Sequence, residues 1–164
     1  KRRNHNLAKL HSVFNLCPRF PAKGNSIELN KFINILHKKT FVAKSIAILG
    51  ASSNREKFGN KAVRAYLSRG WVVFPINPKE ESIEGVNCYA SIKGLPQKPH
   101  RVSIYLPPQI TISLIPELKA SGAREVILNP GAESDALIEA LQKAGIKPLL
   151  LCSIRDIGID PDNL

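Results

Sequence analysis

The chain has 164 residues, 43% of them apolar, which is enough for one packed domain of ordinary size with an appendage. Its apolar runs are shorter than the roughly 18 to 20 residues that cross a bilayer, so we expect no membrane partner. The three cysteines, Cys17, Cys88 and Cys152, are widely spaced without a CxxC pair. This argues against a disulfide framework and a metal site, and it favours a reducing compartment.

The net charge of +11 is unevenly distributed along the chain. Residues 1–44 contain ten basic residues and one acid, whereas the remaining 120 residues contain 14 basic and 12 acidic side chains. Such an asymmetry indicates a nucleic-acid partner or a targeting role for the basic part. We therefore divide the chain into a basic N-terminal extension, residues 1–43, and a domain, residues 44–164.

The extension has two parts of different character. Two prolines and a glycine interrupt residues 1–25, which we expect to form an irregular arm. Residues 26–39 show the apolar spacing of one helical face, and we predict an amphipathic helix there. This helix would either cover a flank of the domain or dock on a partner.

From residue 44 on, short apolar runs alternate with helical segments. We predict strands over residues 45–49, 71–76, 101–106, 125–128 and 147–152, a weak strand over 86–89, and helices over 59–69, 110–120 and 133–144. Four of the strands end at Gly or Pro. This alternation predicts an α/β fold with a doubly wound parallel sheet, Rossmann-like in type, with helices on both faces.

The loop after the first strand is the strongest candidate for a ligand site. In an open parallel sheet, ligands bind outside the carboxyl ends of the strands. The loop leads into a predicted helix, whose N-terminus favours a phosphate, and Gly50 lets the backbone approach a ligand. Ser52 and Ser53 add hydroxyl donors, unless they serve only as a helix cap. Nearby cations are Arg55, Lys57 and Lys79.

The same loop departs from the dinucleotide-binding pattern GxGxxG, because the glycine that follows Gly50 is Gly59. At the end of the second strand, where dinucleotide-binding folds carry an acid for the ribose hydroxyls, the sequence has Asn77, Pro78 and Lys79. A lysine suits a phosphate on the ribose better than a free diol. We therefore expect coenzyme A (CoA) or a phosphorylated dinucleotide and not a nicotinamide dinucleotide.

Four motifs follow one another along the domain: Gly50-Ala-Ser52, Pro75-Ile-Asn-Pro-Lys79, Tyr105-Leu-Pro-Pro108 and Asn129-Pro-Gly-Ala-Glu-Ser134. In this order they resemble the small CoA-binding proteins, whose fold is shared with the CoA-binding domain of the succinyl-CoA synthetase α subunit. The resemblance covers residues 44–158 and implies that CoA or acyl-CoA binds. It places the pyrophosphate at the first loop, the adenosine end at Lys79 and the pantetheine near Pro107 and Pro108. The implied ligand-binding residues are Gly50, Ala51, Ser52, Ser53, Lys57, Asn77, Pro78, Lys79, Leu106, Pro107, Pro108 and Pro130.

The sequence shows no acid–base or nucleophile constellation, so we predict a binding module that is not an enzyme. We expect the extension to contact the phosphate backbone of RNA, unless it is a targeting segment or only a solvated tail. The residues predicted for this contact are Lys1, Arg2, Arg3, Lys9, Arg19, Lys23, Lys38 and Lys39.

An RNA-contacting arm on a binding domain predicts a subunit of an organellar ribonucleoprotein, such as the mitochondrial ribosome, with protein neighbours in a large assembly. The extension is rich in Arg and Lys and nearly free of acids, as mitochondrial targeting segments are, which favours the mitochondrial matrix. The alternatives are a cytoplasmic location, and a free-standing acyl-CoA-binding protein or a ligase-related enzyme fragment.

Overall fold

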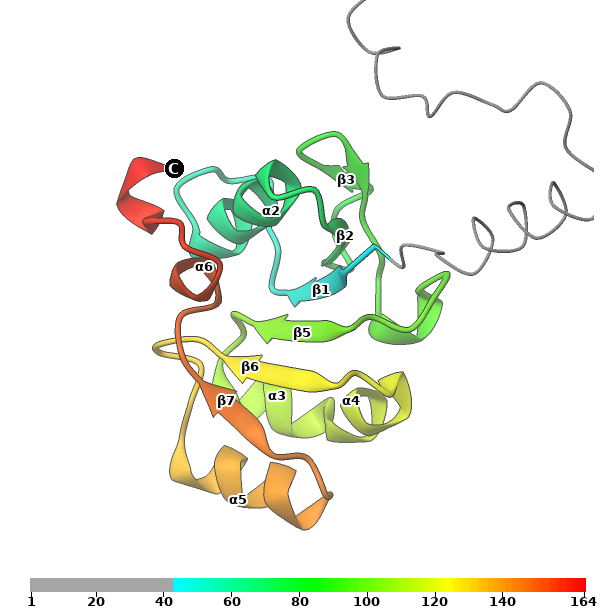
Figure 1. The fold of residues 1–164 in the computed structure, drawn as a ribbon. Helices are drawn as coiled ribbons and strands as arrows, with labels where there is room; N and C mark the ends of the chain where they lie inside the picture. Colours follow the sequence, from blue (N-terminus) through cyan, green and yellow to red (C-terminus); the bar gives the residue numbers. More distant parts are fainter. Residues whose placement is uncertain (1–42) are drawn as a thin grey trace, which may run out of the picture. The chain divides into compact units, whose positions relative to one another are not determined.

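The computed structural model describes residues 43–164. Its central element is a five-stranded parallel sheet with the strand order β2-β1-β5-β6-β7 (Figure 1). The strands are β1 (Ser45–Leu49), β2 (Val72–Ile76), β5 (Arg101–Ile104), β6 (Glu125–Leu128) and β7 (Pro148–Leu150). The chain passes from β2, on one side of β1, to β5, on the other side. The strand order therefore reverses between β1 and β5, and the predicted doubly wound α/β fold is confirmed.

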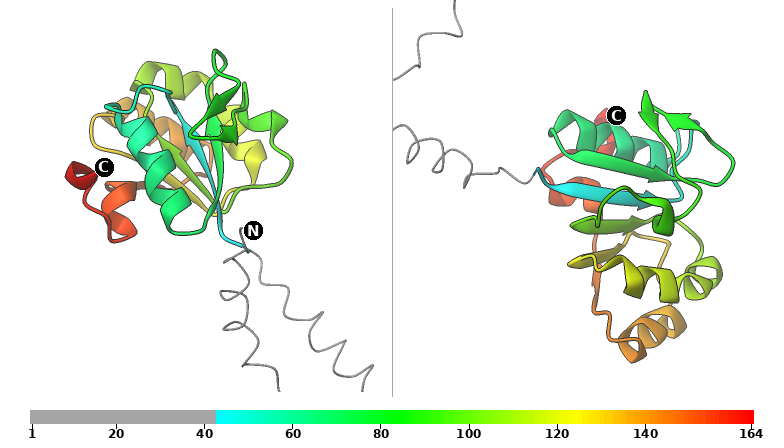
Figure 2. Two further views of the ribbon diagram at one scale, coloured as in Figure 1. Left: turned by 90° about the horizontal axis from the view of Figure 1, so that it is seen from above. Right: turned by 90° about the vertical axis from the view of Figure 1, so that its right-hand side faces the viewer.

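Helices cover both faces of the sheet because its inner strands are apolar on both sides. In β1, Ile46 and Ile48 pack toward α2 (Phe58–Ser68) and α6 (Ser153–Asp156), whereas Ala47 and Leu49 belong to the core on the opposite face. The helices of that opposite face are α3 (Pro108–Ser113), α4 (Ile115–Ser121) and α5 (Asp135–Lys143) (Figures 1 and 2). All five residues of β1 are buried.

Three predicted elements differ from the structure. The helix predicted over residues 110–120 is two helices, α3 and α4, with Pro116 in the first turn of α4, where a residue without an N–H is tolerated. The weak strand predicted over 86–89 is half of an antiparallel hairpin, β3 (Ser82–Ile83) and β4 (Val86–Asn87), which forms a separate sheet. The last strand ends at Leu150, and α6 follows it instead of more strand. Two short 3-10 helices are η1 (Ile92–Gly94) and η2 (Pro161–Asn163).

The basic extension, with the helix predicted over residues 26–39, lies outside the described residues, so the boundary predicted between residues 43 and 44 stays a prediction. Within residues 43–164, no helix is both long enough and apolar enough to cross a bilayer.

The end of β1 and the start of α2 are in unusually close contact. Gly50 has a φ of +85°, and a Cβ at this position would lie 3.1 Å from Cδ2 of Leu106 and from the backbone carbonyl carbon of Tyr105. A Cβ on Gly59 would overlap the carbonyl oxygen of Gly50. Helix α2 can therefore begin directly against the end of β1 only because position 59 is glycine, whereas Gly50 lets the end of β1 lie against the loop after β5.

We expect Gly59→Ala to destabilise the domain by about 1–3 kcal/mol or more, because the added methyl group forces α2 away from β1. Gly94→Ala is the matched control, since a Cβ at Gly94 meets no atom within 4 Å, and we expect a change of less than about 0.5 kcal/mol. Urea unfolding of the three proteins measures both values. Equal losses in the two variants would show that the close contact does not limit position 59.

Candidate ligand-binding site

Two clefts open beside the carboxyl ends of β1 and β5. The first, of about 740 Å³, is lined by the loops after β1 and β2 together with α3 and α4; we call it the β2-side cleft. The second, of about 730 Å³, is lined by the start of α2, the loops after β5 and β6, and the C-terminal segment; we call it the β6-side cleft. Four residues line both clefts: Gly50, Lys57, Tyr105 and Leu106. A long ligand can therefore pass from one cleft into the other at this junction.

The structure brings eleven of the twelve predicted ligand-binding residues to these clefts. The β2-side cleft contains Gly50, Ala51, Ser52, Lys57, Asn77, Pro78, Lys79 and Leu106. The β6-side cleft contains Gly50, Lys57, Leu106, Pro107, Pro108 and Pro130. Ser53 lines neither cleft. That these residues contact a ligand stays a prediction.

Ser53 forms hydrogen bonds with Glu80, which follows β2. Its N–H and its hydroxyl donate to Oε1 of Glu80, at 3.2 and 2.8 Å. Ser52 is also used locally, because its Oγ accepts the N–H of Asn54 at 3.2 Å. Neither serine caps α2, whose N-cap is Lys57 without a side-chain cap. The helix-cap interpretation of Ser52 and Ser53 is therefore wrong.

The rest of the first loop is also held by side chains. The buried Asn60 donates from Nδ2 to the carbonyl oxygen of Ser52 at 2.8 Å and to Oε1 of Glu84 at 3.0 Å. The other carboxylate oxygen of Glu84 pairs with Arg55 at 2.6 Å, so this predicted cation is already neutralised. Asn77 donates from Nδ2 to the carbonyl oxygen of Ala51 at 2.9 Å. Side chains from the segment after β2 and from the β3–β4 hairpin thus fix the loop without a ligand.

The N-terminus of α2 remains available to an anion. The N–H of Asn60 makes the first bond of this helix, to the carbonyl oxygen of Lys57 at 2.9 Å. The N–H groups of Phe58 and Gly59 precede that bond and have no partner within the helix. Both residues line the β6-side cleft next to Gly50. Their N–H groups and the helix dipole make this point suitable for a phosphate.

A polar network lies behind the β6-side cleft and reaches it at Asn129 and Tyr105. Asn129 donates from Nδ2 to Oγ of Ser103 at 2.8 Å, and its Oδ1 accepts the N–H of Ser153 at 2.9 Å. The Oγ of Ser153 accepts a bond from Ser103 at 2.8 Å and lies 2.9 Å from the hydroxyl oxygen of Tyr105. Asn129 therefore shapes the loop after β6 by binding α6 and β5, and its polar atoms face the network.

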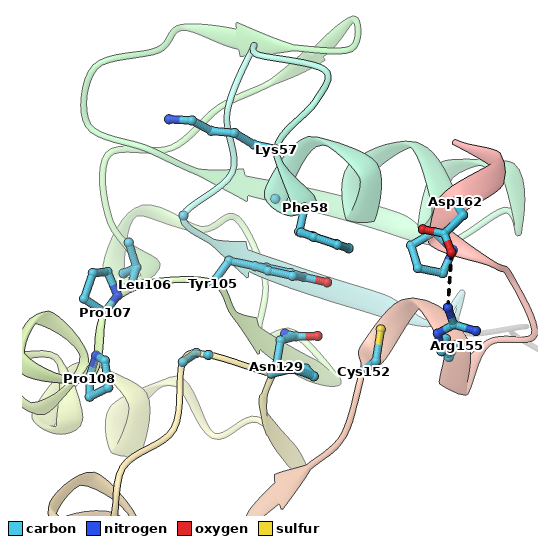
Figure 3. A pocket seen from close by; sticks show the side chains of 16 residues that line it. Lys57, Phe58, Tyr105, Leu106, Pro107, Pro108, Asn129, Cys152, Arg155 and Asp162 are labelled. Atoms are coloured by element: carbon cyan, nitrogen blue, oxygen red, sulfur yellow. Dashed lines mark ion pairs between the residues drawn. The ribbon is translucent and has the colours of Figure 1, made fainter.

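Sequence reasoning missed several residues of the β6-side cleft. Phe58 lies on its α2 side with Tyr105 opposite, while Cys152 and Arg155 lie toward one end (Figure 3). Arg155 pairs with Asp160 at 3.0 Å and with Asp162 at 3.6 Å. The rule that ligand sites follow strand ends, applied to the last strand, would have pointed to Cys152. Nothing in the local pattern indicated Phe58 or Arg155.

In the part of the chain from residue 43 on, no group of three or more His, Cys, Asp or Glu side chains is placed to hold a metal ion. His100 stands at the opposite edge of the sheet, as its position before a strand predicts. Its backbone N–H donates to the carbonyl oxygen of Ser45 at 3.0 Å, at the start of β1.

Comparison with known protein families shows to which family the chain belongs. The model of the family described as "CoA binding domain" matches residues 44–154, more than half of the chain. The chain belongs to the CoA-binding domain family. The resemblance inferred from the four motifs is thereby confirmed. The matched residues include the whole sheet and the β2-side cleft, whereas the β6-side cleft is also lined by Arg155, Pro161 and Asp162, beyond the match.

Relatives of this CoA-binding domain include ligase subunits and small proteins. The α subunit of acetate–CoA ligase (ADP-forming) II from Pyrococcus furiosus is 30% identical over 89 residues, which are 54% of this chain and 20% of the relative. The chain thus spans about a fifth of the length of the curated relatives it matches.

Two solved structures have the same fold. A conserved hypothetical protein from Pyrococcus furiosus is 32% identical with a TM-score of 0.63, over 69% of this chain and 98% of that one. The dinucleotide-forming acetyl-CoA synthetase 1 from Ca. Korarchaeum cryptofilum, in complex with phosphate and ADP, is 26% identical with a TM-score of 0.57. That match covers 65% of this chain and 25% of the synthetase.

Two tyrosines of the CoA-binding domain, the buried Tyr66 and the half-buried Tyr105, give a pH prediction. Burial raises the pKa of Tyr105 and of Tyr66 above the usual value, although hydrogen bonds from neighbouring side chains oppose this rise. The folded protein therefore keeps protons that the unfolded chain releases above about pH 10. We expect the free energy of unfolding to fall as pH rises through this range, by up to about 1.4 kcal/mol per pH unit for each tyrosine. Urea unfolding at a series of pH values measures the slope. Tyr105→Phe should reduce this slope. An unchanged slope would contradict a contribution of Tyr105 to the pH dependence of stability.

Proposed function

We propose that the domain is a CoA-binding module without catalytic activity of its own. The observation that carries the proposal is the uncapped N-terminus of α2 beside Gly50, at the junction of two clefts. A pyrophosphate is the part of CoA that lies between its adenosine and its pantetheine, and it matches an anion position between two clefts. Pockets of about 300–1,000 Å³ are usual for small ligands, and each cleft is of that size.

In the proposed arrangement, the N–H groups of Phe58 and Gly59 bind the pyrophosphate. The adenosine and its ribose phosphate occupy the β2-side cleft, where the exposed Lys79 supplies a positive charge. The pantetheine passes Leu106 and Pro107 into the β6-side cleft. Ser53 is not a ligand residue in this arrangement, because Glu80 accepts from both of its donors.

A binding role without catalysis is supported by the chemistry of the cleft walls. The Tyr105 hydroxyl lies 2.9 Å from Oγ of Ser153 and its pKa is raised, so it is poorly suited to act as a base near neutral pH. The guanidinium of Arg155 is paired with carboxylates. Turnover of an acetyl or succinyl donor by the purified chain would instead favour a ligase-related enzyme.

We also propose that the basic extension contacts RNA in a ribonucleoprotein, with the mitochondrial ribosome as the first particle to test. The supporting observation is the excess of nine positive charges in residues 1–44, against two in the remainder. Neutralising phosphates with Lys and Arg gives affinity that falls steeply with salt. A location in the mitochondrial matrix is part of this proposal, and a cytoplasmic particle is its alternative.

Deletion of residues 1–43 tests the role of the extension. We expect the full chain to co-sediment with mitochondrial ribosomal particles at low salt and to dissociate as salt rises, because its contacts are with phosphates. The truncated chain should stay at the top of the gradient. Unchanged sedimentation after the deletion would contradict an RNA contact through the extension.

Titration with CoA and with dephospho-CoA, which lacks the ribose phosphate, tests the ligand site. Calorimetry should detect CoA binding to the full chain, and no heat at millimolar CoA would overturn the proposal. We expect Lys79→Ala to weaken CoA binding by about 1.5–3 kcal/mol, the usual range for a hydrogen bond to a charged group. Dephospho-CoA should bind the variant and the parent protein alike.

Lys147→Ala is the matched control for this experiment. Lys147 is an exposed lysine that lines neither cleft, so its loss removes the same charge at a distance from the site. We expect both ligands to bind this variant as they bind the parent protein. If Lys79→Ala and Lys147→Ala weaken CoA equally, the effect is one of net charge, and Lys79 does not contact the ribose phosphate.

A further inference from the structure

We propose that the edge of the sheet opposite the clefts binds the phosphate backbone of RNA, so that the domain adds contacts of its own to those proposed for the extension. The inference rests on that part of the proposed function. It follows from a row of cations at the starts of the strands, from the pairing of the acids around this row, and from the point at which the extension joins the domain.

Each of the five strands of the parallel sheet is preceded, within three residues, by an exposed cation. Because the strands are parallel, their starts lie at one edge of the sheet, as the arrows of β1, β5 and β6 show in Figure 1. Neighbouring strands are about 4.8 Å apart, so the cations extend over about 20 Å. We call them the amino-edge row; in the spatial order β2, β1, β5, β6 and β7 they are Arg69, Lys44, Lys98, Arg124 and Lys147.

Backbone hydrogen bonds hold the segments that carry this row side by side. The N–H of Val72 donates to the carbonyl oxygen of Lys44 at 3.0 Å, which joins the starts of β2 and β1. The N–H of Arg124 donates to the carbonyl oxygen of His100 at 3.0 Å, which joins the starts of β6 and β5. The sheet therefore fixes the order and the spacing of the backbone positions in the amino-edge row.

The positive charge of the amino-edge row is not neutralised by ion pairs. Within residues 43–164, none of its five cations forms a salt bridge. Lys44 lies over the ring of Trp71, with its Nζ 5.5 Å from the ring centroid. Arg69 donates to the carbonyl oxygen of Gly158 at 2.9 Å. Both interactions leave the positive charge of the side chain in place.

The acids near the amino-edge row already have partners. Glu125 and Asp156 both pair with Arg101, at the start of β5, so one surplus negative charge stands beside the five positive charges of the row. The acids in the middle of α4 and α5 pair with lysines: Glu117 with Lys93, and Glu139 with Lys143. The row therefore keeps most of its positive charge.

Helix ends contribute a further, smaller negative charge at this edge. Helices α2, α4 and α5 end there, and a helix C-terminus carries about half a negative charge. Three such ends cancel less than half of the surplus. Cations are favoured after a helix C-terminus for this reason alone, but Lys98 follows a loop and the short helix η1. Stabilisation of helix ends thus accounts for only part of the row.

Most acids of the domain gather at the opposite edge of the sheet. Eight of the twelve acids in residues 45–164 lie in the loops and helix starts around the clefts: Glu56, Glu80, Glu81, Glu84, Glu133, Asp135, Asp160 and Asp162. The net charge of +2 in this part of the chain therefore conceals two edges of different character. A long polyanion is attracted to the amino edge and repelled by the acids at the other.

A nucleic-acid backbone fits the amino-edge row better than a compact anion does. Cations spread over about 20 Å can neutralise a series of phosphates but cannot converge on a single one. The extension joins the domain at Lys44, a member of the row, and residues 1–44 carry nine excess positive charges. One RNA strand can thus contact the extension and the row together. The extension holds more of the charge, and the row supplements it.

Fluorescence anisotropy of a labelled oligouridylate, titrated with the full chain at a series of salt concentrations, tests the proposal. The edge variant combines Arg124→Gln with Lys147→Gln, two exposed side chains. Each lost contact with a single strand lowers the slope of log K against log salt by about 0.7. We therefore expect the edge variant to lower the slope by about 1.4, and the affinity at low salt by about tenfold or more.

Lys57→Gln combined with Lys79→Gln is the crossed control. It removes the same charge from the carboxyl edge, where both lysines line the β2-side cleft. We expect this variant to lose affinity for CoA and to keep the salt slope of RNA binding, whereas the edge variant should bind CoA as the parent protein does. Equal falls of the salt slope in the two variants would show an effect of net charge and would overturn the inference.

Three further results would also overturn the inference and leave the extension as the RNA contact. An unchanged salt slope in the edge variant, with a lower stability in urea, would show that the cations serve only the helix ends. Competition between saturating CoA and the oligouridylate would place RNA in the clefts. Tighter binding of oligoglutamate than of oligouridylate would point to an acidic protein partner. If the full chain binds no oligouridylate at low salt, the proposed RNA contact of the extension fails as well.

Discussion

The contact between Gly59 and the carbonyl group of Gly50 is the constraint on which the site depends. Because Gly59 has no side chain, the first turn of α2 lies against the end of β1, at the point where the strand order reverses. The unpaired N–H groups of that turn then stand where the two clefts meet. In the dinucleotide pattern, closely spaced glycines bring helix and strand together. Here the helix and the strand come equally close, although eight residues separate the two glycines. One of these residues, Arg55, pairs with Glu84 of the β3–β4 hairpin.

The two clefts both have largely apolar walls, and they differ in the polar groups that they present. The β2-side cleft has Ser52, Asn77 and the lysine after β2, which suit a nucleotide with its phosphates. The β6-side cleft has aromatic and proline walls and is also lined by Lys57, Arg155 and Asp162.

Much of the fold could be predicted from sequence, because the buried strands are short apolar runs with clear ends. The run at residues 45–49 and the run at 125–128 match β1 and β6 residue for residue. The residues at strand ends, such as Asn77 and Pro107, were also predictable, since a parallel sheet brings all its carboxyl ends to one edge. The role of Ser53 could not be predicted, because it depends on the carboxylate of Glu80, which reaches the loop only in the folded structure. Phe58 and Arg155 were missed for a similar reason: their relation to the cleft is set by the packing of α2 and α6.

The side chains that fasten the first loop have a consequence for the thermodynamics and kinetics of binding. Glu80 and Glu84 hold the loop through Ser53, Arg55 and Asn60 when no ligand is bound. The entropy of ordering this segment is therefore lost during folding and not during association. A ligand that meets such a loop needs no rearrangement of the backbone, so its encounter rate is limited by diffusion and orientation. Differences in affinity between ligands then come from differences in their dissociation rates.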